Sequence, residues 1–128
     1  MSKTIELRGE LETILKTFSD ALYYRYAFPN ANFPYAVYNL QSINGADLLR
    51  FDYDLCIDLW DRSVDGVRIE HISDAMDAQL DRYEIVTDNI IATIFRENSY
   101  PVDEVDKQIQ HIQKHYTVRL FVVRSSMI

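Results

Sequence analysis

The chain has one cysteine, Cys56, and only three glycines and three prolines in 128 residues. A lone cysteine excludes an internal disulfide and fits a reducing compartment. Scarce glycine and proline argue against disorder and against glycine-rich phosphate-binding loops. No apolar run has the length of a membrane span, and the N-terminal residues do not form a signal peptide. We therefore expect a protein that is made and used in the cytoplasm.

Basic residues are also in the minority, with 13 Lys and Arg against 20 Asp and Glu and a net charge of −7. Binding to a nucleic-acid backbone requires a cationic patch that neutralises phosphates. The composition therefore disfavours nucleic acid as a bound ligand and is typical of soluble cytosolic proteins. The length of 128 residues predicts a single domain, residues 1–128. Because 48% of the residues are hydrophobic, this domain can form one core.

The clearest structural signal is the stretch from Leu48 to Asp61, where apolar and polar side chains alternate from Phe51 onward. A period of two residues predicts a long strand with one buried face. The predicted buried face consists of Phe51, Tyr53, Leu55, Ile57 and Leu59. The opposite face consists of Asp52, Asp54, Cys56, Asp58 and Trp60.

Two segments have the apolar spacing of amphipathic helices, residues 5–20 and residues 67–84. Thr4 is the expected N-cap of the first helix, and Ser63 or Asp65 that of the second. The apolar stripes of the two helices are Leu7, Leu11, Ile14, Leu15 and Phe18, and Ile69, Ile72, Met76, Leu80 and Tyr83.

Four further strands are predicted at residues 22–27, 35–40, 89–96 and 109–124, and loops at 29–34, 41–47 and 97–107. Asn44-Gly45 is a hairpin turn signal, so the first three strands are expected to form an antiparallel meander. The element order α-β-β-β-α-β-β predicts an α+β fold. We expect a mostly antiparallel sheet of about five strands with both helices packed on one face.

No catalytic or cofactor-binding motif is found. Cys56 lies between Asp54 and Asp58, whose carboxylates raise the pKa of a thiol, so a nucleophile is not expected. His111 and His115 are four residues apart and could hold a metal on one face. No metal motif surrounds them, so the favoured interpretation is a pair of surface or edge-strand histidines. We predict neither an enzyme nor a metal site.

Trp60 lies on the otherwise polar face of the long strand. Exposed large aromatic residues are enriched in interfaces, so Trp60 is a candidate contact residue, together with Tyr35, Asn44 and Tyr100. The alternative is that a loop or a chain end covers the indole ring.

Three motifs follow one another along the chain. Pro34-Tyr35 opens a strand, Trp60 closes a later strand, and the helix that follows ends in a pattern of small residues and leucine at residues 75–80. This arrangement, over about Leu7 to Val123, resembles the tail-terminator or tail-completion proteins of long-tailed bacteriophages and prophages, which join tail to head. The resemblance implies a structural protein without catalytic residues.

The resemblance also implies a ring, typically a hexamer, at the end of the tail tube. The implied partners are other copies of the chain, the tail-tube protein and a head-completion or connector protein. The implied locations are the host cytoplasm during assembly and then the virion, with no membrane. DNA would pass through the ring without specific binding, and Asp52, Asp54 and Asp58 would face the lumen and repel phosphates. The alternatives are carboxylates that only keep the surface soluble, a neighbouring head-closure or neck component, and a small cytosolic α+β binding module.

Overall fold

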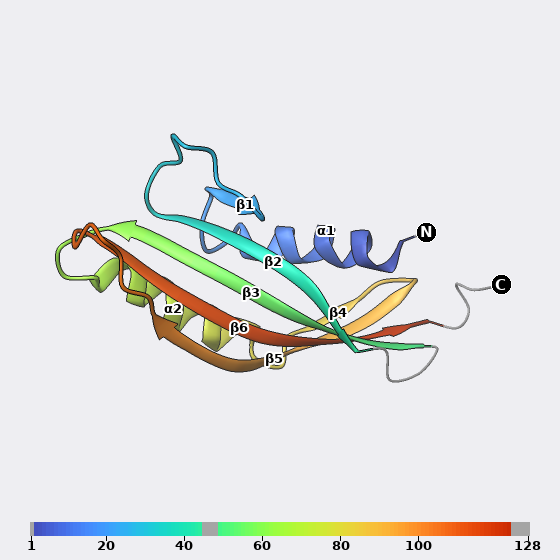
Figure 1. Ribbon diagram of the computed structural model, residues 1–128. Coiled ribbons are helices and arrows are strands. Elements are labelled where there is room, and N and C mark those ends of the chain that lie inside the picture. Colours follow the sequence, from blue (N-terminus) through green and yellow to red (C-terminus); the bar gives the residue numbers. More distant parts are fainter. Residues whose placement is uncertain (1, 45–48, 124–128) are drawn as a thin grey trace.

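A computed structural model describes residues 2–44 and 49–123, which form two helices and one sheet of six strands (Figure 1). The elements in chain order are α1 (Lys3–Leu15), β1 (Leu22–Tyr24), β2 (Tyr35–Asn44), β3 (Arg50–Arg62), α2 (Val67–Leu80), β4 (Glu84–Val86), β5 (Ile90–Pro101) and β6 (Ile109–Val122). Neither of these helices is long and apolar enough to cross a membrane.

The strands lie side by side in the order β1-β2-β3-β6-β5-β4, and the long strands twist and curl along their length (Figure 1). β1 and β2 are parallel, whereas the other neighbours are antiparallel. β3 lies in the interior of the sheet, between β2 and β6. The long alternating strand is therefore central, as its sequence predicts.

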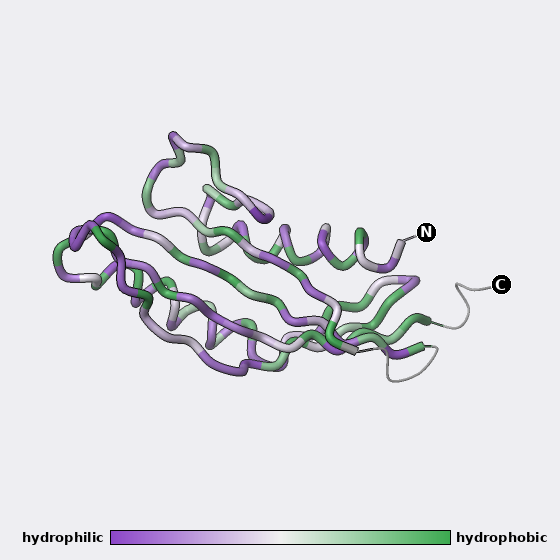
Figure 2. The backbone as a smooth tube through the Cα atoms, in the orientation of Figure 1, coloured by the Kyte–Doolittle hydropathy of each residue, from purple (hydrophilic) through white to green (hydrophobic). Residues whose placement is uncertain are grey.

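Both helices pack on the same face of the sheet, which we call the inner face (Figure 1). Apolar and polar stretches alternate along the long strands (Figure 2). The buried apolar side chains of β3 belong to one core cluster with those of both helices. The core combines Leu7, Leu11 and Leu15 of α1, Ile69, Met76 and Leu80 of α2, and Tyr53, Leu55, Ile57 and Leu59 of β3. The predicted α+β class and the packing of both helices on one face are confirmed.

The predicted antiparallel meander of the first three strands is wrong, because β1 runs parallel to β2, with Leu22 opposite Ala36 and Tyr24 opposite Tyr38. Parallel neighbours need a long connection that brings the chain back to the same end. The segment 25–34 is such a connection, and it projects from the body of the molecule (Figure 1). The sheet is therefore mixed.

The predicted count of about five strands is also wrong, because β4 follows α2 and the order is α-β-β-β-α-β-β-β. The helix ends at Leu80, and Arg82 takes a left-handed conformation with a φ of 63°. The N–H of Arg82 then donates to the carbonyl of Ile94, whose own N–H donates to the carbonyl of Tyr83. Pairing with β5 thus replaces the last predicted turn of the helix.

The first half of the predicted loop 97–107 belongs to β5 instead. A shift in register between Arg96 and Asn98 allows the strand to continue along β6, so that Tyr100 pairs with Gln113. The predicted loop 41–47 begins as strand, since β2 extends to Asn44. The rest of that loop, including Gly45 of the predicted turn, lies outside the described residues.

The helix starts also differ from prediction. Ser2 is the N-cap of α1 and its hydroxyl accepts from the N–H of Ile5, whereas Thr4 lies inside the helix and contacts the hydroxyl of Tyr53. Gly66, with a φ of 70°, occupies the N-cap position of α2. The side chain of Asp65 still accepts a hydrogen bond from the N–H of Val67 at 3.0 Å.

Candidate interaction surface on the outer sheet face

An aromatic row crosses the outer face of the sheet, the face turned away from the helices. The row consists of Phe33, Tyr35, Trp60 and His111. Tyr35 of β2 and His111 of β6 are the register partners of Trp60 on either side. The ring centroids of Tyr35 and Trp60 are 5.2 Å apart and those of Trp60 and His111 are 4.2 Å apart, both stacked. Such cross-strand aromatic pairs stabilise a sheet beyond the area that they bury.

His111 lies between two carboxylates. Its Nε2 is 2.7 Å from Oδ1 of Asp58, and its Nδ1 is 2.9 Å from Oε1 of Glu104. Ionised carboxylates only accept hydrogen bonds, so both contacts are made only when both ring nitrogens carry a proton. The ring of His111 is therefore held between a carboxylate of β3 and one of the segment between β5 and β6.

Glu104 attaches the segment between β5 and β6 to the outer face. Its Oε1 also accepts a hydrogen bond from the indole N–H of Trp60 at 3.2 Å. Trp60 is therefore partly covered by a loop residue, which was one of the two alternatives for this side chain. Its role as a contact residue stays a prediction.

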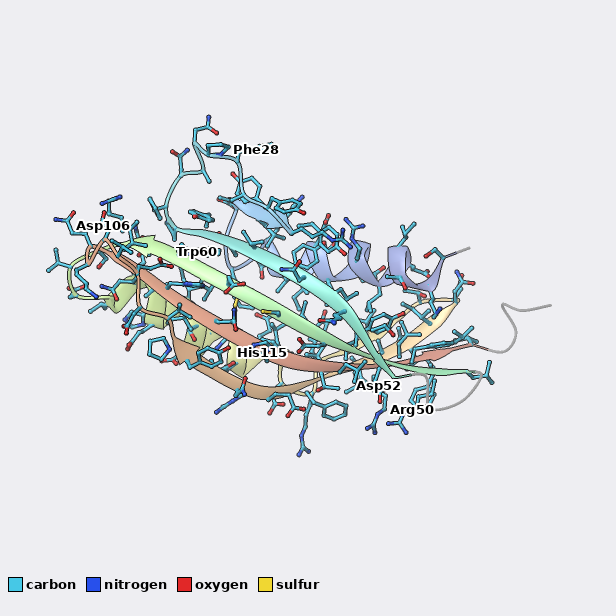
Figure 3. The ribbon with its side chains drawn as sticks, viewed as in Figure 1. Phe28, Arg50, Asp52, Trp60, Asp106 and His115 are labelled. Carbon is cyan, nitrogen blue, oxygen red and sulfur yellow. The ribbon has the colours of Figure 1, made fainter. Side chains whose placement is uncertain are left out.

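The carboxylates of the outer face contact basic side chains. Asp52 lies 3.1 Å from Arg50 and 3.7 Å from Arg119, and Asp54 lies 3.3 Å from His115. Arg50 and Asp52 lie near one end of β3, and Trp60 lies toward the other end (Figure 3). The outer face therefore carries less net negative charge than its aspartates alone suggest.

Cys56 is half-buried in the middle of this face, and its Sγ lies 3.8 Å from Oδ2 of Asp58. Burial, followed by the carboxylates of Asp58 and Asp54, raises the pKa of the thiol to about 12. The thiolate is the nucleophilic form, so this position suppresses reactivity, as predicted from the flanking aspartates.

Lys114 lies on the inner face of β6 and its side chain is fully buried. The Nζ donates to the hydroxyls of Ser73 at 2.8 Å and Ser99 at 3.3 Å, and it pairs with Asp77 at 3.0 Å. A serine bound to a lysine can form a nucleophilic pair when the amine is neutral. Here the carboxylate of Asp77 stabilises the ammonium ion, so the arrangement is a buried ion pair that joins α2 to the sheet.

The prediction that His111 and His115 are a pair of surface or edge-strand histidines is wrong. His111 is buried and β6 lies in the interior of the sheet, because β3 and β5 pair with it on both sides. The two carboxylates around His111 bind opposite nitrogens and do not converge on one point. Within the described ranges, no group of three His, Cys, Asp or Glu side chains could hold a metal ion.

The predicted contact residues do not form one patch. Tyr35 and Trp60 are neighbours in the aromatic row, whereas Tyr100 lies on β5 with its hydroxyl bound to Gln113 and its ring stacked 6.0 Å from that of His115. Asn44 ends β2, far along the strand from Tyr35, and its side chain lies outside the described part of the structure.

Sequence reasoning missed the roles of Glu104 and Lys114. Lys114 is in phase with Tyr116, Val118 and Leu120, the residues of β6 that the structure buries. This period of two residues was a readable signal for a buried lysine. Glu104 gave no such signal, because it lies outside any strand or helix and one of its partners, Trp60, is 44 residues away.

The fold has counterparts among solved structures. No protein-family model and no curated protein matches the chain. A chain from the virion of a native gene transfer agent particle is 10% identical, with 84% of each chain covered and a TM-score of 0.66. Another protein of known structure is 12% identical, with 96% of each chain covered and a TM-score of 0.64. At these identities the likeness is one of fold.

The carboxylate of Asp58 gives a testable pH dependence. Burial alone would raise its pKa, but the hydrogen bonds from His111 and Gln113 outweigh burial and hold the pKa below the ordinary 3.8. A lowered folded pKa means that the ionised carboxylate stabilises the fold above the unfolded pKa, and that this contribution is lost as the pH falls through the folded pKa. When the pH is lowered through this window, we expect the free energy of unfolding to fall less for Asp58→Asn than for the wild type.

Urea denaturation at a series of pH values through this window measures the effect. Asp54→Asn is the matched control, because Asp54 lies on the same face but is 32% exposed. If Asp58→Asn and the wild type lose the same free energy of unfolding on acidification, the carboxylate of Asp58 does not contribute as described.

Proposed function

We propose that the protein is a structural component of a bacteriophage or prophage virion that forms a ring at the end of the tail tube, terminates tail assembly and joins the tail to the head. The observation that carries this proposal is the fold likeness to a chain of a gene transfer agent virion over 84% of both chains. The likeness agrees with the independent resemblance of the Pro34-Tyr35, Trp60 and 75–80 motifs to tail-terminator proteins.

The exposed apolar side chains support an assembly role. Val64 and Val105, which are 90% and 100% exposed, lie in the two segments that follow β3 and β5. Tyr26 and Phe28 are exposed in the connection between β1 and β2. Apolar side chains that share one exposed surface, as Tyr26 and Phe28 do in this connection, are typical of surfaces that partners cover.

The paired carboxylates give the proposed passage of DNA a physical basis. In the proposed ring, Asp52, Asp54 and Asp58 face the lumen. Asp52 pairs with the cations Arg50 and Arg119, and Asp54 and Asp58 contact the rings of His115 and His111. Cations that are already bound to carboxylates are poor ligands for DNA phosphates, which must displace them. The pairing of Arg50 and Arg119 with Asp52 would then leave less positive charge to hold DNA on the described part of the outer face.

Deletion of the gene from a phage or prophage that carries it tests the proposal. We expect filled heads and separate tails of irregular length in electron micrographs, and restoration of joined particles by the wild-type gene in trans. Mass spectrometry of purified particles should find the protein, and antibody labelling should place it at the head-proximal end of the tail.

Other outcomes identify the alternatives. Label on tailless heads would favour a head-closure or neck component. Normal particles that lack the protein would overturn a virion role and favour a cytosolic binding module.

A further inference from the structure

The connection between β1 and β2 carries an aromatic knob, which we define as Arg25, Tyr26 and Phe28. Tyr26 is 79% exposed and Phe28 is 68% exposed. Phe28 lies on the projecting part of this connection (Figure 3). Its ring contacts that of Tyr23 edge-on at 5.5 Å, so the sheet supports it from below.

The backbone holds the knob in place. The N–H of Arg25 donates to the carbonyl of Tyr38 on β2, and the N–H of Ala31 donates to the carbonyl of Phe28, both at 3.0 Å. An exposed aromatic tip on an ordered turn loses little conformational entropy when it binds, which favours it as an anchor.

A groove lies between α1 on one side and the C-terminal end of α2 with β4 on the other. Its volume is about 510 Å³, within the range of sites that enclose a bulky ligand group. The apolar lining residues are Ile14, Tyr83, Ile85 and Val86, and the acidic ones are Glu10 and Glu84. Val86 is 67% exposed, so part of the apolar lining is open to a partner.

The knob and the groove are complementary in charge. Arg25 is exposed, and its guanidinium lies 5.2 Å from the centroid of the Tyr24 ring. Glu10 and Glu84 are also exposed, and neither forms an ion pair with any residue in the described ranges. A cation beside two exposed aromatic rings therefore matches an apolar groove with acidic residues in its lining.

The two features belong to opposite edges of the sheet. The knob extends from β1, and the groove adjoins β4, which are the two edge strands. A contact between unlike surfaces on opposite edges is heterologous, so each copy can use both surfaces at once. Such contacts close into a ring when the rotation between copies allows it.

We propose that the aromatic knob of one copy docks into the groove of the next copy, with Arg25 pairing with Glu10 and Glu84. This inference rests on the proposed ring, for which it names the contact between subunits. Tyr26 and Phe28 cover the apolar lining, and the ion pairs set the direction of docking.

Sedimentation velocity of the full chain over a concentration series tests the contact. We expect Arg25→Glu and Glu84→Arg each to raise the dissociation constant about tenfold, as the loss of one favourable charge pair at an interface does. The double variant Arg25→Glu/Glu84→Arg should recover most of the loss, because the charges are exchanged. Lys107→Glu is the control, since it makes the same charge change as Arg25→Glu at an exposed residue outside both surfaces.

Circular dichroism confirms that each variant folds. The contact is overturned if Arg25→Glu associates as tightly as Lys107→Glu, if the double variant shows no recovery, or if the wild type is monomeric at every concentration. Particle incorporation separates this result from the proposed function. If Arg25→Glu still restores joined virions to the deletion strain, the function stands and the subunit contact lies elsewhere.

Discussion

Ile57→Ala is expected to lower the free energy of unfolding by about 2–5 kcal/mol, the usual cost of truncating a fully buried large aliphatic side chain. Ile57 has no exposed surface and belongs to the core cluster between the sheet and the two helices. On β3 it is the register partner of Tyr38 on one side and of Lys114 on the other. Because these neighbours are held by their own contacts, the space left by the missing atoms would not collapse completely.

Urea denaturation followed by tryptophan fluorescence and by circular dichroism measures this loss. Asp54→Ala, three residues earlier on the same strand, is the matched control. Its side chain is 32% exposed on the outer face, and its contact with His115, which is 26% exposed, is accessible to solvent, so we expect a cost below about 1 kcal/mol. A larger cost for Asp54→Ala than for Ile57→Ala would contradict the assignment of the two faces of β3.

Lys114→Met is the second variant with a large expected effect, about 3 kcal/mol, because breaking a buried ion pair leaves its partner uncompensated. Methionine keeps the length and much of the volume of the side chain, so the effect arises mainly from charge. The carboxylate of Asp77, which is 18% exposed, would retain the hydroxyl of Tyr116 as a donor at 2.6 Å but lose the ammonium ion. Ser73 and Ser99 would also each lose a donor.

The double variant Lys114→Met/Asp77→Asn distinguishes loss of charge pairing from loss of packing. An amide oxygen can still accept from Tyr116, and Arg96, the other ion-pair partner of Asp77 at 3.9 Å, is 57% exposed and remains solvated. Because no buried charge is left unpaired, we expect the double variant to be less destabilised than the sum of the single variants. Thermal and urea denaturation of all four proteins complete the cycle. A Lys114→Met protein as stable as the wild type would show that the ion pair does not stabilise the fold.

Local patterns in the sequence determined the main elements. The alternation from Phe51 to Leu59 predicted both the central strand and its buried face, because the side chains of a strand point alternately to its two faces. The spacing of Leu7, Leu11 and Leu15 predicted the buried face of α1 for the corresponding reason, the period of a helix. Because the period of each segment clearly distinguishes a helix from a strand, these patterns also sufficed to predict the α+β class.

Only the tertiary structure decided which strands pair and which polar groups meet. The direction of β1 depends on the path of the connection 25–34, and β4 forms because β5 offers an edge to the chain beyond α2. Asp58 meets His111 across 53 positions of sequence, and Lys114 meets Ser73 across 41. Hydrogen bonds and ion pairs act over a few ångströms, so these contacts exist only after the strand register has brought distant residues together, and no local period encodes them.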